Sequence, residues 1–310
     1  MPPAVKSTST LISTSTRPNR RADWLLLLVT ILAAISWMFS KEALGEFPPF
    51  LFICARFLMA GLLLSVPGWR GITRLSGQQW RAASGVGLIF GAAMSIWIMG
   101  LLTTSHLGEG SFITTLSVVM VPLVGWLIFR DRISRSNWVA LPLAFIGLAL
   151  LSLQHGFRPD KSQILFFIAA LLLSLTFILN SRAAAHVPSL SLSAIQLSIV
   201  GLVALVLSSI FEDWPAVWTP TMWLWILLSI TVGTAVRFFI QTYAQSMTSS
   251  NNAAVIMILE PVWTSIIAAM WFKEGMVFTQ LLGCCCIFFA LVANRWPAIV
   301  SWLRKSYFAK

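Results

Sequence analysis

Apolar runs, each close to the length of one membrane-spanning helix, take up most of this chain. They cover residues 24–41, 48–67, 80–101, 109–129, 137–153, 163–182, 189–210, 221–243, 250–272 and 277–296. A helix needs about 20 apolar residues to cross a bilayer, and its backbone groups must be hydrogen-bonded within the segment itself. Only 10% of the residues are charged, compared with about 25% in soluble domains. The sequence therefore predicts an all-α integral membrane protein with ten transmembrane helices.

Basic residues are distributed unevenly among the loops between these runs. One set of alternate segments contains Lys6, Arg17, Arg20, Arg21, Arg70, Arg74, Arg81, Arg130, Arg132, Arg135, Arg182, Arg295, Arg304, Lys305 and Lys310. The opposite set contains Lys41, Arg158, Lys161 and Lys273. Segments rich in Lys and Arg stay on the cytoplasmic side, so we expect both termini to be cytoplasmic. The net charge of +11 is explained by this orientation signal, and no nucleic-acid partner is expected.

The second half of the chain repeats features of the first half in the same order. The runs 109–131 and 251–274 each contain a proline and end in an aromatic, a basic and an acidic residue. Further matches are 36–41 with 177–182 and Pro48 with Pro188. An internal duplication is the simplest explanation of these ordered matches.

This duplication divides the chain into two five-helix repeats, at 24–153 and 163–296. We expect a linker loop at 154–162, a disordered cytoplasmic tail at 1–23 and a cytoplasmic tail at 297–310. Because each repeat has an odd number of helices, the second repeat must be inverted relative to the first. Inverted repeats with broken helices are typical of secondary transporters.

An acidic residue lies in the middle of the ninth run. An ionisable group such as Glu260 is costly at this depth and marks a candidate functional site. Pro261 follows it at once and removes one helical hydrogen bond, which predicts a helix break beside a polar or wet cavity. Pro122, in the fourth run, predicts a second break. The alternative interpretation of Glu260 is a structural carboxylate bonded to neighbouring helices.

Two arginines also lie inside apolar runs. At 1.5 Å per residue, Arg56 lies about 12 Å from one membrane surface and Arg237 about 10 Å from the other. Each needs an acidic partner or an anionic ligand, and both lie within about 5 Å of Glu260 in depth. We predict that Glu260 pairs with one of them and leave open which one. The alternatives are a fixed structural ion pair or, for Arg237, a side chain that extends to the headgroups.

Trp37, Trp97 and Trp263 are placed well inside their runs. A buried indole N–H needs a partner, so a cavity wall is one interpretation, and packing against helices or lipid is the other. The chain has no nucleotide-binding loop and no cluster of His and acidic residues. We therefore expect no cofactor, no metal and no enzyme activity. The four cysteines lie in apolar runs and are interpreted as packing residues.

Several local motifs occur in an order known from one group of membrane proteins. They consist of Trp37, Ser40, Lys41, Pro48, Pro49, Phe50, Arg56, Phe57, Ala60, Thr103, Thr104, Ser105, Pro122, Arg130, Asp131, Tyr243, Ala244, Gln245, Glu260, Pro261, Lys273 and Glu274. With the ten runs, they make the chain after residue 23 resemble the drug/metabolite transporter superfamily, specifically the EamA-like ten-helix permeases. Met38 and Asp131 depart from the family pattern, which usually has Gly and Glu there.

The resemblance implies a carrier of the bacterial inner (plasma) membrane with a central cavity and alternating access. It implies a secondary transporter of a small metabolite or amino acid, with export as the expected direction. An importer of the same class and a membrane-embedded binding or scaffold protein without transport are the alternatives. Expected partners are a small-molecule substrate and the lipid bilayer, with protons as a candidate coupling ion. Substrate identity and oligomeric state are left open.

Overall fold

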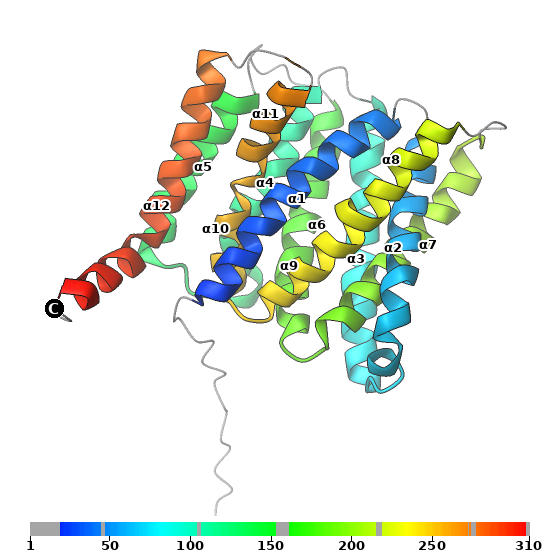
Figure 1. Ribbon diagram of the computed structural model, residues 1–310, viewed down its shortest axis with the longest axis horizontal. Helices are drawn as coiled ribbons and strands as arrows, with labels where there is room; N and C mark the ends of the chain where they lie inside the picture. The colour runs from blue at the N-terminus through cyan, green and yellow to red at the C-terminus, as the bar shows by residue number, and fades with distance from the viewer. Residues whose placement is uncertain are drawn as a thin grey trace, which may run out of the picture.

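The computed structural model describes residues 19–44, 47–103, 107–152, 161–214, 219–271, 273 and 277–307. Every regular element within these residues is a helix (Figure 1). The first half contains α1 (Arg20–Leu44), α2 (Pro49–Ile72), α3 (Gly77–Thr103), α4 (Leu107–Phe129) and α5 (Arg135–Ser152). The second half contains α6 (Lys161–Ala184), α7 (Ser189–Phe211), α8 (Pro220–Ile230), η1 (Thr231–Val236), α9 (Arg237–Gln245), α10 (Ser250–Met257), α11 (Glu260–Trp271) and α12 (Phe278–Tyr307).

Two spans of the second half are subdivided. α8, η1 and α9 follow one another without a loop, and only the turn at Ile258 and Leu259 separates α10 from α11. Counted as single spans, the described helices form ten, as predicted. Seven are long and apolar enough to cross a membrane, and three shorter apolar helices lie at Ile113–Phe129, Arg135–Leu150 and Phe278–Ala293. The all-α membrane fold expected from the sequence is confirmed.

The first helix begins earlier than expected. α1 starts at Arg20, so residues 20–23 are helical and the prediction of disorder for them is wrong. The Asn19 side chain explains this start, because its Oδ1 accepts hydrogen bonds from the backbone N–H groups of Arg21 and Ala22, at 3.2 and 3.4 Å. Such an N-cap satisfies donors that the helix leaves unpaired. Residues 1–18 of the predicted tail lie outside the described residues.

The last helix ends later than expected. α12 continues past residue 296 to Tyr307, so most of the segment predicted as a C-terminal tail extends the final helix. The beginning of α1 and the end of α12 lie at the same end of the bundle, which is the lower end in Figure 1. We call this end the lower end and the opposite one the upper end. Of the predicted linker loop, residues 154–160 lie outside the described residues.

α4 runs without interruption through Pro122, so the predicted helix break at this proline is wrong. The missing N–H of Pro122 removes one hydrogen bond, to the carbonyl of Val118. Val121 and Val124, on either side of the proline, are buried in one cluster with Ile178 of α6 and Ala254 of α10. α4 therefore continues through Pro122 with one backbone hydrogen bond missing.

The contacts between helices relate the two halves. α2 packs against α7 and α5 against α12, so these helices meet their counterparts in the other repeat. In the first half, α3 and α4 both pack against α6, the first helix of the second half. In the second half, the equivalent helices pack against α1 in the same way: α8 and α9 correspond to α3, and α10 and α11 correspond to α4. A two-fold axis between inverted repeats produces this exchange of neighbours. α5 and α12 lie at one side of the bundle and α2 and α7 at the other (Figure 1).

Glycines let the counterpart helices approach one another closely. A Cβ at Gly201 of α7 would overlap the backbone of Leu58 in α2. In the other pair, a Cβ at Gly147 of α5 would lie 2.9 Å from the carbonyl oxygen of Gly283 in α12. Small residues at such crossings permit the close contacts that hold membrane helices together. Both counterpart pairs therefore pack almost backbone to backbone.

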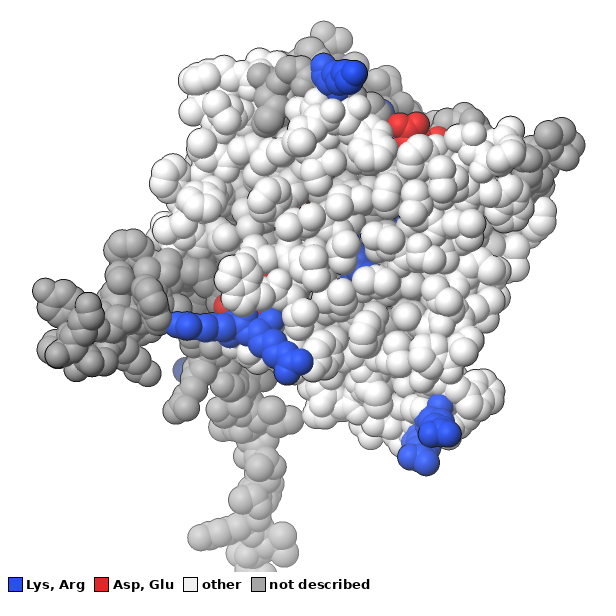
Figure 2. Space-filling model, viewed as in Figure 1, with Lys and Arg blue, Asp and Glu red and all other residues white. Residues whose placement is uncertain are grey.

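The outer surface is apolar between the two ends of the bundle. On the face drawn in Figure 2, charged side chains gather mainly near the edges. Most of the exposed tryptophans lie near helix ends, and these are Trp24, Trp69, Trp80, Trp126, Trp138, Trp214, Trp223 and Trp271. This distribution is typical of the aromatic belts at the two membrane surfaces. The surface therefore fits a protein that is surrounded by lipid.

Candidate functional site

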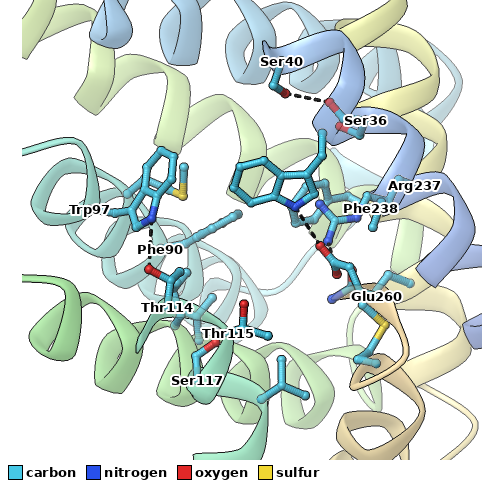
Figure 3. Close-up of a pocket in the computed structure, with 18 of the residues that line it drawn as sticks. Ser36, Ser40, Phe90, Trp97, Thr114, Thr115, Ser117, Arg237, Phe238 and Glu260 are labelled. Atoms are coloured by element: carbon cyan, nitrogen blue, oxygen red, sulfur yellow. Dashed lines mark hydrogen bonds and ion pairs between the residues drawn. The ribbon is translucent and has the colours of Figure 1, made fainter. Parts of the chain in front are cut away.

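A cavity of about 600 Å³ lies at the centre of the bundle. Both repeats line it, with side chains from α1, α2, α3 and α4 and from α6, α7, α9, α10 and α11. Figure 3 shows polar groups of several helices around the cavity, and they include Ser36, Ser40, Thr114, Thr115 and Ser117. Cavities of about 300–1,000 Å³ hold small organic molecules, so this one is large enough for a metabolite.

Glu260 lies at the break in the ninth span. α10 ends at Met257, and α11 begins at Glu260 with Pro261 in its first turn. Proline is accepted there because the N–H groups of a first turn have no partner within the helix. The ninth span is therefore interrupted at Ile258 and Leu259, just before Glu260 and Pro261. This interruption places the Glu260 carboxylate at a helix N-terminus and in the wall of the cavity.

The Glu260 carboxylate contacts two side chains. Its Oε2 lies 3.2 Å from Nη2 of Arg237, and its Oε1 accepts a hydrogen bond of 3.2 Å from Nε1 of Trp37 (Figure 3). The prediction that Glu260 pairs with an intramembrane arginine is confirmed, and the partner is Arg237. The side chains of Arg237 and Glu260 are 17% and 20% exposed, so the pair forms part of the cavity wall.

Arg237 follows directly after a turn of π-helix. The π-helical segment η1 ends at Val236, and α9 begins at Arg237. Single π-helical turns inside α-helices occur frequently at functional sites. The Arg237 guanidinium lies 5.0 Å from the centroid of the Phe238 ring. Its Nε is buried and has no hydrogen-bond partner among the described residues, so Arg237 has a donor that Glu260 does not use.

Arg56 is bound by neutral oxygens and not by a carboxylate. Its Nε donates to Oγ1 of Thr234 at 2.6 Å, and its Nη1 donates to Oγ of Ser40 at 2.7 Å. Its Nη2 donates to Oγ of Ser36 at 2.5 Å and to the carbonyl of Gly233 at 3.1 Å. These bonds join α1, α2 and η1 beside the cavity. No ion pair within the described residues neutralises the Arg56 charge.

Trp37 and Trp97 form part of the cavity wall, whereas Trp263 is not among its lining residues. The first two rings meet edge to face with their centroids 6.3 Å apart, and Nε1 of Trp97 donates to Oγ1 of Thr114 at 3.1 Å. Trp263 packs against the apolar cluster that joins α4, α5 and α12. The cavity interpretation therefore fits Trp37 and Trp97, and the packing interpretation fits Trp263.

Sequence reasoning missed a polar cluster below the cavity. Asn180 of α6 donates a hydrogen bond to Oε1 of Gln245 and another, of 3.3 Å, to Oγ1 of Thr242. Gln196 of α7 donates to the same threonine hydroxyl at 3.5 Å. All four side chains are buried. Asn180 and Gln196 each interrupt an apolar run, and this was the available signal, because such side chains bond across membrane helices.

The polar cluster closes the cavity toward the lower end of the bundle. α4 packs against α10 at this level, with Val121 and Ala254 buried in one cluster. Farther up, the close neighbours of α11 within the described residues are α1 and α12 and not α4. Trp37 is 40% exposed. Among the described residues, the helices around the cavity therefore pack together more closely at its lower end than at its upper end.

Comparison with known proteins assigns this architecture to a family. A model described as the EamA-like transporter family matches residues 20–153 and again residues 160–295. The chain belongs to the EamA-like transporter family. The resemblance found in the motifs is thereby confirmed, and this EamA-like protein is a multi-pass membrane transporter and not an enzyme.

Proteins similar to this EamA-like transporter are themselves named transporters. One from Archaeoglobus fulgidus, named an uncharacterized transporter, is 27% identical over 278 residues, which cover 87% of this chain and 84% of that protein. The uncharacterized transporter YvbV of Bacillus subtilis is 26% identical over 281 residues, covering 86% of this chain and 88% of that protein. A solved crystal structure covers 91% of this chain and 98% of its own, with a TM-score of 0.78 and 16% identity, which supports the fold alone.

Proposed function

We propose that this EamA-like transporter is a secondary transporter that exports a small metabolite or an amino acid by alternating access. The observation that carries the proposal is the central cavity between the repeats, with the Glu260–Arg237 pair in its wall. Secondary transporters with inverted repeats bind their substrates near the membrane midplane, where discontinuous helices meet. The helix break before Glu260 lies at the same cavity.

The basic residues support an orientation for this cavity. Arg20, Arg70, Arg130 and Arg182 lie at helix ends on the lower side of the bundle, and such residues favour the cytoplasmic side. We therefore propose that both termini are cytoplasmic, in a bacterial inner membrane. Close packing of the described helices below the cavity then supports an outward-facing state. An exporter releases its substrate from such a state.

Protons are the coupling ion that the cavity supports best. Glu260 is a carboxylate at intramembrane depth, in contact with an accessible cavity, and such residues serve as proton relays in transporters. The charged groups that line the cavity within the described residues are Glu260, Arg237 and Arg56. Protonation of Glu260 would remove the negative charge from its ion pair with Arg237 and so change the charge of the cavity wall. Proton binding and substrate binding would then be linked through one side chain.

Solute flux in proteoliposomes tests this function. The purified protein is reconstituted, and the movement of labelled metabolites and amino acids is followed under an imposed proton gradient. We expect at least one solute to move against the direction of proton flow, as an exporter requires. Movement in the same direction as the protons would show an importer. A well-folded protein that moves none of the solutes, with or without a gradient, would support a binding or scaffold role instead.

A further inference from the structure

The charges of the side chains that line the cavity do not sum to zero. Among the described lining residues, the charged ones are Arg56, Arg237 and Glu260, which leaves a positive excess when Glu260 is ionised. Glu260 is paired with Arg237, whereas the bonds of Arg56 go to hydroxyl and carbonyl oxygens. A charge without an ionic partner is costly inside a membrane. An anion bound in the cavity would lower that cost.

Arg237 is the contact point for such an anion. A guanidinium carries five N–H donors and binds carboxylates through parallel hydrogen bonds. The Nη2 atom of Arg237 contacts Glu260 through one contact of 3.2 Å, and the Arg237 side chain lines the cavity and is 17% exposed. The Nε1 of Trp37 already donates to the Glu260 carboxylate. The donors in this part of the cavity are therefore arranged to hold carboxylate oxygens.

The wall beside these donors is aromatic. Phe57, Phe90 and Phe238 all line the cavity, and their ring centroids lie 5.5, 5.8 and 5.5 Å apart. Trp37 and Trp97 add a second aromatic surface. Aromatic side chains bury large apolar groups. A molecule that occupies this cavity is therefore expected to have an apolar body as well as a charged group.

A cationic or zwitterionic molecule fits the same wall less well. Within the described lining residues, Glu260 is the only carboxylate, so an ammonium group would have to compete with Arg237 for it. Such a ligand would also leave the charge of Arg56 without an ionic partner. A monoanion, in contrast, neutralises the excess charge and leaves the Glu260–Arg237 pair in place.

We infer that this transporter carries an organic monocarboxylate with an apolar body, held by Arg237 in the field of Arg56 and enclosed by the aromatic wall. This inference rests on the proposed function and selects an anionic metabolite over an amino acid. It also explains why the cavity contains an arginine without an acidic partner. The negative charge of the substrate would balance the excess positive charge of the side chains that line the cavity.

Four probes that share a phenyl body test the preference for charge. They are 3-phenylpropanoate as the anion, 3-phenylpropanamide as the neutral form, phenylalanine as the zwitterion and 2-phenylethylamine as the cation. Binding to the purified full chain is measured by thermal shift and by tryptophan fluorescence. We expect the anion to bind at least about tenfold more tightly than the others, as a hydrogen bond to a charged group implies. Equal affinities, tighter binding of the zwitterion or cation, or no binding of the anion would overturn the inference.

Substitutions in the cavity should shift the affinity of the anion in opposite directions. Arg237→Gln should weaken binding of 3-phenylpropanoate about tenfold or more, and Glu260→Gln should strengthen it, because the excess positive charge increases. Lys161→Gln is the matched control, since it removes a positive charge from an exposed position at the upper end of α6. If Arg237→Gln does not fold, Glu260→Gln decides, and unchanged or weaker anion binding in that variant contradicts the inference.

Flux separates a failure of this inference from a failure of the proposed function. If 3-phenylpropanoate binds in the expected order but no solute crosses the membrane, the charge preference stands and the transport function fails. If phenylalanine or phenylethylamine crosses the membrane and the anion neither binds nor crosses, the transport function stands and the inference fails. The two measurements use the same purified chain, so they can be made on one preparation.

Discussion

Replacing Glu260 with glutamine removes the negative charge of the cavity and keeps the length of the side chain. The amide oxygen of glutamine can still accept the hydrogen bond from Nε1 of Trp37. Arg237, however, loses the carboxylate that lies 3.2 Å from its Nη2. The substitution therefore tests the charge of the Glu260 side chain separately from its size.

The cost in stability follows from the exposure of the ion pair. Removing one partner of a fully buried pair costs about 3–5 kcal/mol, whereas exposed pairs contribute about 0–1 kcal/mol. The side chains of Glu260 and Arg237 are 20% and 17% exposed and meet through one contact of 3.2 Å. Because the pair is only partly buried, water can take over part of the lost contact, and we expect a loss of about 1–2 kcal/mol. The variant should therefore fold, with a melting temperature lowered by a few degrees.

The functional effect should be larger than the effect on stability. In proteoliposomes at several pH values, we expect wild-type protein to show net flux that responds to a proton gradient. Glu260→Gln should lose this gradient-driven net flux, because glutamine does not bind a proton. It should retain the exchange of substrate for substrate across a membrane without a gradient. Comparing net flux and exchange therefore separates loss of coupling from loss of substrate binding.

The double variant Glu260→Gln/Arg237→Gln controls for the arginine that loses its partner. It should recover the stability lost in Glu260→Gln, because no unpaired charge remains at this position, but it should not recover coupling. Unchanged gradient-driven flux at every pH in a well-folded Glu260→Gln protein would refute a role of this carboxylate in coupling. Loss of folding in Glu260→Gln alone would instead show that the pair is structural.

Three further outcomes are expected. Arg56→Ala should reduce transport or folding far more than Lys161→Ala, as measured by transport assays and thermal melts. Arg56→Lys should restore transport and folding only in part, because an ammonium lacks the planar fork of donors with which the guanidinium bonds α1 and η1. Gly201→Ala should destabilise the protein by about 1–3 kcal/mol in thermal melts, whereas Gly85→Ala, where an added Cβ meets no atom within 4 Å, should not. Reporter fusions at the two termini should both report the cytoplasm, and opposite locations would contradict the ten-helix topology.

The number of spans and the depth of Glu260 could be predicted because both are properties of position along the chain. Apolar length alone defines a membrane span, and counting residues gives the depth of a side chain within it. This was sufficient to expect a pair between Glu260 and an arginine. It was not sufficient to choose between Arg237 and Arg56, since that choice depends on the direction in which each side chain leaves its helix.

The parts that could not be predicted depend on contacts between distant segments. The π-helical turn η1 directly precedes Arg237, and nothing in the apolar run that contains it distinguishes it from an α-helix. The bond between Asn180 and Gln245 joins residues far apart in the chain. Pro122 does not interrupt α4, although it removes one helical hydrogen bond. A proline in a sequence therefore does not by itself indicate where a membrane helix is interrupted.

The continuous α4 and the interrupted span of α10 and α11 occupy equivalent positions in the two repeats. The same fourth helix of the repeat thus exists in two shapes within one molecule, one uninterrupted at Pro122 and one divided just before Pro261. In a molecule built from inverted halves, exchanging the shapes of the halves turns the cavity from one membrane surface to the other. For the transport cycle proposed above, we expect the first half to bend at Pro122 when the second half becomes continuous. Under the proposed alternating access, we expect each repeat to adopt in turn the two shapes that α4 and the span of α10 and α11 have in this state.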